Sequence, residues 1–347
     1  MDNSTLIFAL LVLFTACSSP KQKDTVEEEK DTETPDSYPT TGTVERLHDE
    51  INRLIPTDAE IEILAEGFTW SEGPLWLEEQ KMLIFSDVPE NTVYKWKEGQ
   101  GKAVYLKPSG YTDSKSRSGE TGSNGLLLSP DGKLVLCQHG DRRVASMEAP
   151  LGEPESNFAT LAGNWQNKKF NSPNDAAYHQ NGDLYFTDPP YGLPQQANDP
   201  TREINFQGVY KVSPEGEVTL LTDELSRPNG IAFSPDFKKL YVANSDPKKA
   251  IWMVYDIKED GTLQNGKVFF DASDKVGELK GLPDGLKVNA DGYVFATGPG
   301  GVLLFDPMGK HLGTIKTGQA TANCAFDTGG SYLYITADMY LMRIKLQ

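Results

Sequence analysis

The chain contains few of the residues on which several protein classes depend. Its 347 residues include 3 Cys and 4 His, too few cysteines for a disulfide scaffold, and the histidines have no zinc-ligand spacing. Lys and Arg number 33 against 50 Asp and Glu, a net charge of -17, which argues against a nucleic-acid partner because phosphate binding needs basic patches. The chain has neither a Gly-Xaa-Ser-Xaa-Gly elbow nor a phosphate-binding glycine loop, which argues against serine-hydrolase and nucleotide chemistry.

Long apolar runs are also absent, and the run Leu6–Phe14 is too short to span a membrane. It leads into Thr15-Ala16-Cys17, which resembles a bacterial lipobox and implies cleavage before Cys17 and lipidation of that cysteine. An ordinary signal peptide followed by an incidental cysteine is the alternative. We expect residues 1–16 to be a lipoprotein signal peptide and residues 17–43, which are acidic and poor in apolar residues, to be a disordered tether. The expected location is the bacterial cell envelope, facing the periplasm or the exterior, with membrane contact through the lipid anchor only.

The rest of the chain is rich in turns, with 32 Gly and 22 Pro. Residues 44–60 predict a short helix and a linker, because Leu47, Ile51 and Leu54 have helical spacing. Residues 61–347 repeat a unit of two short apolar strands joined by a Gly, Pro, Asn or Asp turn. The second strands of these units are Met82–Phe85, Leu134–Cys137, Leu184–Phe186, Leu240–Val242, Tyr293–Phe295 and Leu333–Ile335.

Six such units, at intervals of roughly 40 to 55 residues, predict an all-β fold. It is a six-bladed β-propeller of four-stranded antiparallel blades around a central channel. We expect the last strand, residues 341–346, to pair with residues 62–64 and so close the ring. Cys137 and Cys324 could form a disulfide, but two buried free thiols are the preferred interpretation.

One polar residue recurs at the start of the first strand of every unit. These six positions, called the ring residues below, are Glu72, Asn124, Asn174, Asn229, Asp284 and Asn323. First strands line the channel of a propeller, so the six side chains are predicted to converge at one mouth of it. Oxygen ligands of this kind suit one divalent cation, with calcium the best match and magnesium, manganese, zinc or iron(II) open. The alternative is that these residues only begin turns.

The same region resembles the SMP-30/gluconolactonase/LRE family, and most of all its bacterial gluconolactonase branch. The resemblance rests on Trp70-Ser71-Glu72-Gly73-Pro74, Asn171-Ser172-Pro173-Asn174-Asp175, Thr187-Asp188-Pro189-Pro190-Tyr191-Gly192, Arg227-Pro228-Asn229-Gly230 and Leu282-Pro283-Asp284-Gly285. It implies a propeller that binds one divalent metal through Glu72, Asn229 and Asp284, with Asn174 beside the metal as ligand or substrate contact. Animal members carry a sugar-contacting Arg two positions before that Asn, where this chain has Ser172.

The resemblance further implies a metal-dependent hydrolase that opens a small sugar-acid lactone to the aldonic acid. We expect Asp284 to serve as general base as well as ligand. The expected substrate contacts are Asn174, Asn124, Asp175, Asn323 and His139, although a structural or surface role is the preferred interpretation for His139. Tyr191, Trp165 and Phe206 are candidate pocket walls, with core packing as the alternative. Asp175 and Asp188 either support the site or cap their turns. The alternatives are a broader lactonase or esterase for non-sugar lactones, or a non-catalytic propeller that binds a ligand or partner. A closed propeller of this kind is expected to be a monomer.

Overall fold

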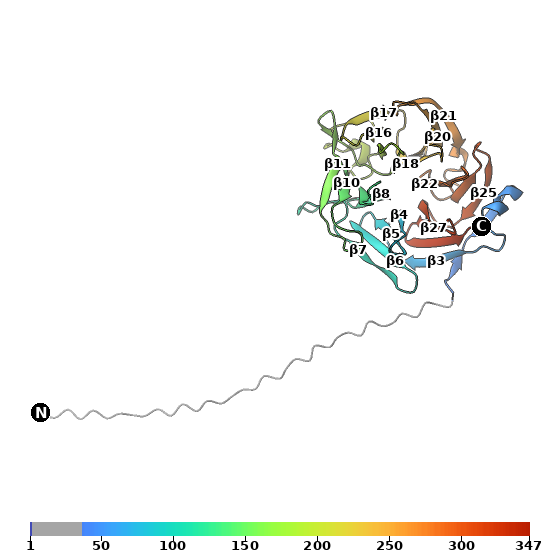
Figure 1. Cartoon of the computed structure of the whole chain (residues 1–347), viewed down its shortest axis with the longest axis horizontal. Helices are drawn as coiled ribbons and strands as arrows, with labels where there is room; N and C mark the ends of the chain where they lie inside the picture. The colour runs from blue at the N-terminus through green and yellow to red at the C-terminus, as the bar shows by residue number, and fades with distance from the viewer. Residues whose placement is uncertain (2–36) are drawn as a thin grey trace. The chain divides into compact units, whose positions relative to one another are not determined.

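The computed structural model describes Met1 and residues 37–347. The predicted signal peptide, Cys17 and most of the predicted tether therefore lie outside the described residues. Residues 37–347 form six antiparallel sheets arranged as blades around a centre (Figure 1). Within the described residues, no helix is both long enough and apolar enough to cross a membrane. The predicted six-bladed all-β propeller is confirmed.

Each blade runs from an inner strand at the channel to an outer strand at the periphery, as the labels in Figure 1 show. Blade 1 consists of β4 (Ser71–Leu77), β5 (Met82–Asp87), β6 (Thr92–Lys97) and β7 (Gly101–Leu106). Blade 2 consists of β8 (Ser123–Leu128), β9 (Leu134–Gln138), β10 (Arg143–Met147) and β11 (Phe158–Ala162). Blade 3 consists of β14 (Ala176–Tyr178), β15 (Leu184–Asp188), β16 (Gly208–Val212) and β17 (Val218–Thr222). A small hairpin of β12 (Asn164–Trp165) and β13 (Lys168–Lys169) lies between blades 2 and 3 in the sequence.

Blades 4 to 6 repeat the arrangement, and blades 5 and 6 each gain a fifth strand. Blade 4 consists of β18 (Pro228–Phe233), β19 (Lys239–Asp246), β20 (Lys249–Ile257) and β21 (Leu263–Asp271). Blade 5 consists of β22 (Leu286–Val288), β23 (Val294–Gly298), β24 (Gly301–Phe305), β25 (His311–Lys316) and β2 (Thr43–Arg46). Blade 6 consists of β26 (Thr321–Phe326), β27 (Tyr332–Ala337), β28 (Tyr340–Lys345), β3 (Ile61–Glu66) and β1 (Thr40–Thr41). Three 3-10 helices are present in the described residues, namely η1 (Asp49–Arg53), η2 (Gln196–Asn198) and η3 (Ser273–Lys275).

The N-terminal segment closes the ring as the sequence predicted, because β3 pairs with the last strand β28 and places Ile63 opposite Met342. The residues that precede β3 differ from the prediction. Residues 40–41, expected in the disordered tether, form β1 against β3. Residues 43–46, expected in the tether and the lead-in helix, form the outer strand β2 against β25, and only η1 is helical in this segment. The strand β2 gains hydrogen bonds from β25. Ile51, in η1 just after this strand, is fully buried against blades 5 and 6, so the same segment also gains apolar contact.

The core is a ring of apolar clusters, one at each junction between neighbouring blades. Cluster members come from blades 1 and 2, 2 and 3, 3 and 4, 4 and 5, 5 and 6, and 6 and 1. The second strands read as continuous apolar runs because both of their faces are covered by adjacent blades. Cys137 and Cys324 are buried, free thiols in two different clusters, so they are not bridged.

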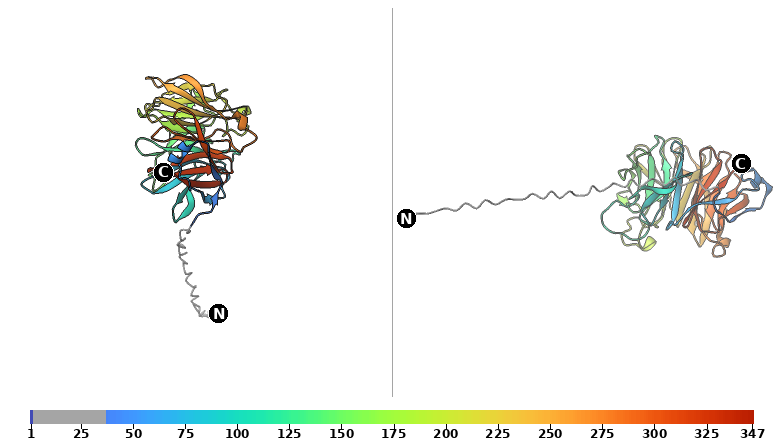
Figure 2. Two further views of the ribbon diagram at one scale, coloured as in Figure 1. Left: turned by 90° about the vertical axis from the view of Figure 1, so that its right-hand side faces the viewer. Right: turned by 90° about the horizontal axis from the view of Figure 1, so that it is seen from below.

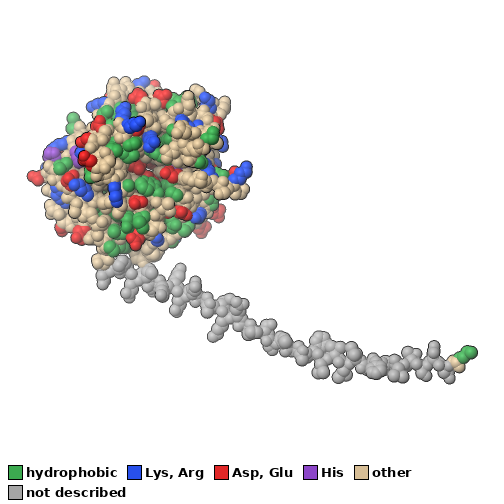
Figure 3. Space-filling model, turned by 180° about the vertical axis from the view of Figure 1, so that it is seen from behind, with side chains coloured by type: hydrophobic (Ala, Val, Ile, Leu, Met, Phe, Trp, Pro, Cys, Tyr) green, Lys and Arg blue, Asp and Glu red, His purple; other side chains and the backbone are tan. Residues whose placement is uncertain are grey.

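The folded part has its C-terminus on the rim, beside the segment that contains η1 (Figure 2). Gln347 N donates to the carbonyl oxygen of Leu54 at 3.1 Å, which ties the two ends of the ring together. On the face seen from behind, acidic and basic side chains are interspersed with apolar ones (Figure 3).

Candidate functional site

The ring residues stand at the channel ends of the six inner strands. Four of them lie within β4, β8, β18 and β26, while Asn174 and Asp284 directly precede β14 and β22. Five of the six, all except Asn323, line one cavity of about 430 Å³. The periodicity of the sequence therefore corresponds to a single site.

Glycines after the ring residues allow this convergence. A Cβ atom at Gly230 would lie 2.2 Å from the carbonyl oxygen of Asp284, and one at Gly73 would lie 2.1 Å from that of Asn124. Gly73 also has a φ of 50°, a conformation that favours glycine. The inner strands of adjacent blades can approach this closely only without side chains here, and that approach brings neighbouring ring residues together.

Several oxygens at the site are buried without a partner. Oδ1 of Asn124, of Asn174 and of Asp284 has no hydrogen-bond partner among the described residues. A buried polar atom without a partner costs free energy, so these oxygens indicate a missing donor or cation. Carboxylate and amide oxygens are the donors that hard divalent cations take, so the donor set fits such an ion.

The electrostatics of the two ring carboxyls agree with this. Burial raises the pKa of Glu72 to about 8, with the charge of Asp175 adding to the effect. Burial also raises the pKa of Asp284 well above its usual range, with the charge of Glu72 as the second cause. Two such groups favour a positive charge between them. In the described part of the chain no three His, Cys, Asp or Glu side chains form a metal-binding group, so any ligand set here must include amide oxygens.

Three predicted substrate contacts lie outside the cavity wall. Asn323 donates from Nδ2 to Glu72 Oε2 at 3.4 Å, while its Oδ1 accepts from the backbone N–H of Cys324 at 2.9 Å. It therefore holds Glu72 in place. Asp175 is buried, and its Oδ1 accepts from the N–H of Ala176 at 2.9 Å. His139 is buried behind Asn174, with 3.5 Å between its Nε2 and the Asn174 amide nitrogen.

Asp188 acts as a turn cap, one of the two roles considered for it from the sequence. Its carboxyl accepts from the N–H of Asn171 at 2.8 Å and of Ser172 at 2.7 Å. Ser172 in turn donates to the Pro189 carbonyl at 2.6 Å and accepts from Gly192 N at 2.9 Å. These bonds secure the turn before Asn174 to the turn that carries Tyr191.

The cavity wall also contains residues to which the sequence assigned no role in the site. Trp70, Arg227, Leu282 and Thr321 each stand two positions before a ring residue and line the cavity. Side chains two apart on a strand point the same way, so this offset was a usable signal. Glu120 and Ser245 also line the cavity but come from positions without a repeat signal.

Among the aromatic candidates, only Tyr191 lines the cavity, with the Arg227 guanidinium 6.0 Å from its ring centre. Trp165 and Phe206 pack against each other, 5.8 Å between ring centres, at the junction of blades 2 and 3. The predicted pocket wall of three aromatics is therefore reduced to one.

The amide of Asn229 is oriented by a hydroxyl behind it. Its Nδ2 donates to Ser245 Oγ at 2.9 Å, and Ser245 Oγ donates to the Pro283 carbonyl oxygen. Because the hydroxyl proton is committed to Pro283, Ser245 can only accept from the amide. Asn229 Oδ1 is thereby left for the cavity.

Known proteins resemble this chain over most of its length. A model of the SMP-30/Gluconolactonase/LRE-like region matches residues 70–338. A gluconolactonase from Zymomonas mobilis is 37% identical over 317 residues, covering 88% of this chain and 86% of the relative. Regucalcin from Xenopus laevis is 25% identical, covering 79% of this chain and 85% of the relative.

Solved structures agree with the sequence relatives. A gluconolactonase from Xanthomonas campestris superposes with a TM-score of 0.76 at 30% identity, covering 90% of this chain and 98% of the other. A calcium-binding regucalcin from Agrobacterium tumefaciens shares the fold, with a TM-score of 0.63 at 19% identity over 89% of this chain and 95% of the other. The family match spans well over half of the chain, so this protein belongs to the SMP-30/gluconolactonase/LRE-like family, as its motifs predicted.

Proposed function

We propose that the protein is a lactone hydrolase that opens a sugar-acid lactone to the aldonic acid. The observation that carries the proposal is the cavity in which the two ring carboxyls and three ring amides converge, with three oxygens that lack partners among the described residues. Identity of 37% to a gluconolactonase over most of both chains supports the same reaction class.

The residues that would hold a divalent cation are Glu72, Asn229, Asp284 and Asn174. When bound, such an ion polarises the lactone carbonyl and lowers the pKa of a nearby water. Calcium suits this all-oxygen set best, and magnesium, manganese, zinc and iron(II) are the other candidates. The raised pKa values of Glu72 and Asp284 support a cation because either carboxylate alone is disfavoured in this buried site.

Asp284 is the proposed general base. Asp284 lines the cavity, so its carboxylate can accept a proton from a water molecule there. The water oxygen then bonds to the carbonyl carbon, the ring C–O bond breaks, and the proton goes to the departing ring oxygen. Burial raises the pKa of Asp284 above its ordinary value, and a carboxylate with a higher pKa is a stronger proton acceptor.

The remaining cavity residues would orient the substrate. Asn124 and Asn174 point amide groups into the cavity, where they can bind the ester or its hydroxyls. Arg227 offers guanidinium donors in the absence of an Arg at position 172, and the faces of Trp70 and Tyr191 can cover the C–H face of a sugar ring.

The test is gluconolactone hydrolysis followed as acid release, with spontaneous hydrolysis subtracted. We expect Asp284→Asn to lower kcat at least about 100-fold, the usual scale for a lost general base, and a chelator to abolish activity reversibly. Asp58→Asn, at an exposed aspartate, is the matched control and should retain full activity. Activity that is absent in the wild type, or that ignores both the chelator and Asp284→Asn, contradicts the proposal.

A second candidate function is hydrolysis of non-sugar lactones. It is favoured by the apolar part of the cavity wall, which includes Pro247, Val276 and Leu282. Hydroxyl groups placed against these side chains would lose hydrogen bonds to water. A higher kcat/KM for an alkyl-substituted δ-lactone than for gluconolactone would select this candidate.

The location of the protein stays a prediction. Cys17, the proposed lipid attachment site, lies outside the described residues, and so do the predicted signal peptide and most of the tether. We propose a monomeric lipoprotein of the cell envelope, which metabolic labelling with a fatty acid in wild type and Cys17→Ala would test.

A further inference from the structure

Two side chains in contact with each other, the buried His139 and the partly exposed Glu120, lie behind Asn174. His139 follows β9 and is fully buried, and its two ring nitrogens face different groups. Nε2 lies 3.5 Å from Asn174 Nδ2, and Nδ1 lies 3.3 Å from Glu120 Oε2. Glu120, on the loop between β7 and β8, also lines the cavity.

With a neutral imidazole, the chemistry of these groups allows one consistent arrangement. A neutral imidazole has one N–H donor and one acceptor nitrogen, whereas a carboxylate only accepts. A proton on Nδ1 therefore faces Glu120, and Nε2 becomes an acceptor. Glu120 is at ion-pair distance without full hydrogen-bond geometry, and its side chain is 36% exposed.

An acceptor at Nε2 decides how the amide of Asn174 must lie. Only Nδ2 can donate to it, and this leaves Asn174 Oδ1, which has no hydrogen-bond partner among the described residues, as the amide atom for the cavity. We propose that the Glu120–His139 pair fixes the amide orientation of Asn174, so that His139 is a positioning residue for the oxygen that meets cation or substrate. The use of that oxygen rests on the proposed function, whereas the orientation itself does not.

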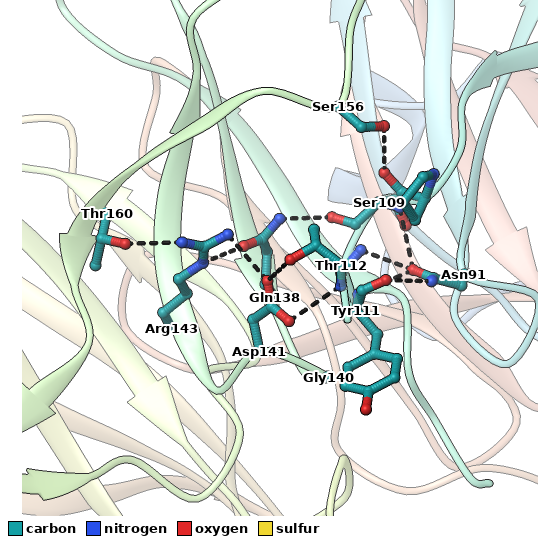
Figure 4. A network of polar contacts seen from close by, with 12 residues as sticks. Asn91, Ser109, Tyr111, Thr112, Gln138, Gly140, Asp141, Arg143, Ser156 and Thr160 are labelled. Atoms are coloured by element: carbon teal, nitrogen blue, oxygen red, sulfur yellow. Dashed lines mark hydrogen bonds and ion pairs between the residues drawn. The ribbon is translucent and has the colours of Figure 1, made fainter. Parts of the chain in front are cut away.

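The loop that carries Glu120 is held against the His139 turn. Asn91 Oδ1 accepts from the N–H groups of Ser109, Gly110 and Tyr111 at 3.1, 2.8 and 3.1 Å (Figure 4). Thr112 donates through Oγ1 to Asp141 at 2.7 Å, just beyond His139. The proximity of Glu120 to His139 is thus built into the fold.

Arg117 adds a second restraint to the same loop. Its guanidinium donates to the carbonyl oxygens of Gly140 and Gly192, which flank His139 in space. A Cβ atom at Gly192 would lie 2.6 Å from His139 Cβ, so the imidazole has little room to turn. Asn229, oriented by Ser245 and the Pro283 carbonyl, is a parallel case on the next blade.

The first experiment measures the tautomer of His139 in the intact protein. Long-range ¹H–¹⁵N spectra of ¹⁵N-histidine-labelled protein, in mildly alkaline buffer and with His139→Ala for assignment, report which ring nitrogen carries the proton. We expect the Nδ1–H tautomer, and a mixture of tautomers in Glu120→Ala. A wild-type Nε2–H tautomer would donate to Asn174 Oδ1 and reverse the amide, which overturns the proposal.

The second experiment is a double-mutant cycle on cation affinity, with Mn²⁺ and Ca²⁺ titrated into chelator-treated protein. We expect His139→Ala to weaken binding roughly 10-fold or more, as for other groups that orient metal ligands. In the Asn174→Asp background the effect of His139→Ala should fall below about threefold, because a carboxylate presents an oxygen whichever way it turns. Equal losses in both backgrounds would mean a general structural role and would overturn the proposal.

Gln138→Ala is the matched control. Gln138 is buried beside His139 at the end of β9. Its Nε2 donates to the Ser109 carbonyl at 2.9 Å and its Oε1 accepts from Arg143 at 2.6 Å (Figure 4). Its loss should perturb the local network and leave cation affinity unchanged, and a loss equal to that of His139→Ala would overturn the proposal. A wild-type protein without lactonase activity contradicts the proposed function alone, because the tautomer measurement decides the orientation independently.

Discussion

The buried ring carboxyls predict an unusual dependence of stability on pH in the metal-free protein. Burial raises the pKa of Glu72 from 4.5 to about 8. A carboxyl whose pKa is higher in the folded than in the unfolded state binds more protons when folded, so stability falls as the pH rises. The loss begins near the unfolded value of 4.5 and is complete above about 8.

The size of the effect follows from the shift. Each pKa unit corresponds to about 1.4 kcal/mol, so Glu72 costs on the order of 5 kcal/mol once the pH exceeds its folded pKa. The Glu72→Gln variant removes this cost because the amide stays neutral. We therefore expect chelator-treated Glu72→Gln to be more stable than the wild type in mildly alkaline buffer, with a melting temperature higher by on the order of 10 °C. The two proteins should converge below the unfolded pKa.

The assay is thermal unfolding of chelator-treated wild type and variant across this pH range, with the exposed Glu60→Gln as control. Other carboxyls with raised pKa values, such as Asp188, titrate in both proteins, so the difference between the curves reports Glu72 together with its effect on the neighbouring Asp284. Excess Ca²⁺ should stabilise the wild type and not Glu72→Gln, since only the wild type keeps the full ligand set. Parallel pH profiles for wild type and Glu72→Gln would refute the reasoning.

Two further predictions concern packing. Gly230→Ala places a Cβ 2.2 Å from the Asp284 carbonyl oxygen, so we expect a loss of about 3 kcal/mol in unfolding free energy and at least tenfold in activity, whereas Gly152→Ala, where the Cβ meets open space, should be neutral in both assays. Ile51→Ala removes a fully buried side chain from the junction of blades 5 and 6 and should cost about 3 kcal/mol by denaturant unfolding, while Leu47→Ala, at a side chain 50% exposed, should change little. A neutral Ile51→Ala would show that the N-terminal segment is dispensable for the fold.

Local patterns in the sequence were sufficient for the blade count and for the ring. Each unit carries its own turn and its own buried second strand, so six repeats could be counted without any long-range information. The pairing of β28 with β3 was also predictable, because a propeller must cover its last edge. The strand β2 was not predictable, since Thr43–Arg46 is short and its partner β25 is far away in the chain.

The residues of the site also fall into those that local sequence patterns predicted and those that they did not. The phase of the repeat located Glu72, Asn124, Asn174, Asn229 and Asp284, and the offset of two would also have located Trp70 and Arg227. Glu120 was out of reach because it comes from a long connection between blades, whose path depends on Asn91 and Arg117. His139, a candidate substrate contact for which a structural role was the preferred alternative, lies behind Asn174.

The sequence by itself determined which residues recur in phase, and therefore the propeller, its inner strands and the oxygen-rich composition of its channel mouth. Only the tertiary structure decided which oxygens are left without partners there, and that Asn323 serves Glu72 rather than the cavity. The reason is physical. Strand periodicity is a local property of the backbone, whereas the orientation of an amide depends on donors and acceptors that loops bring in from other blades.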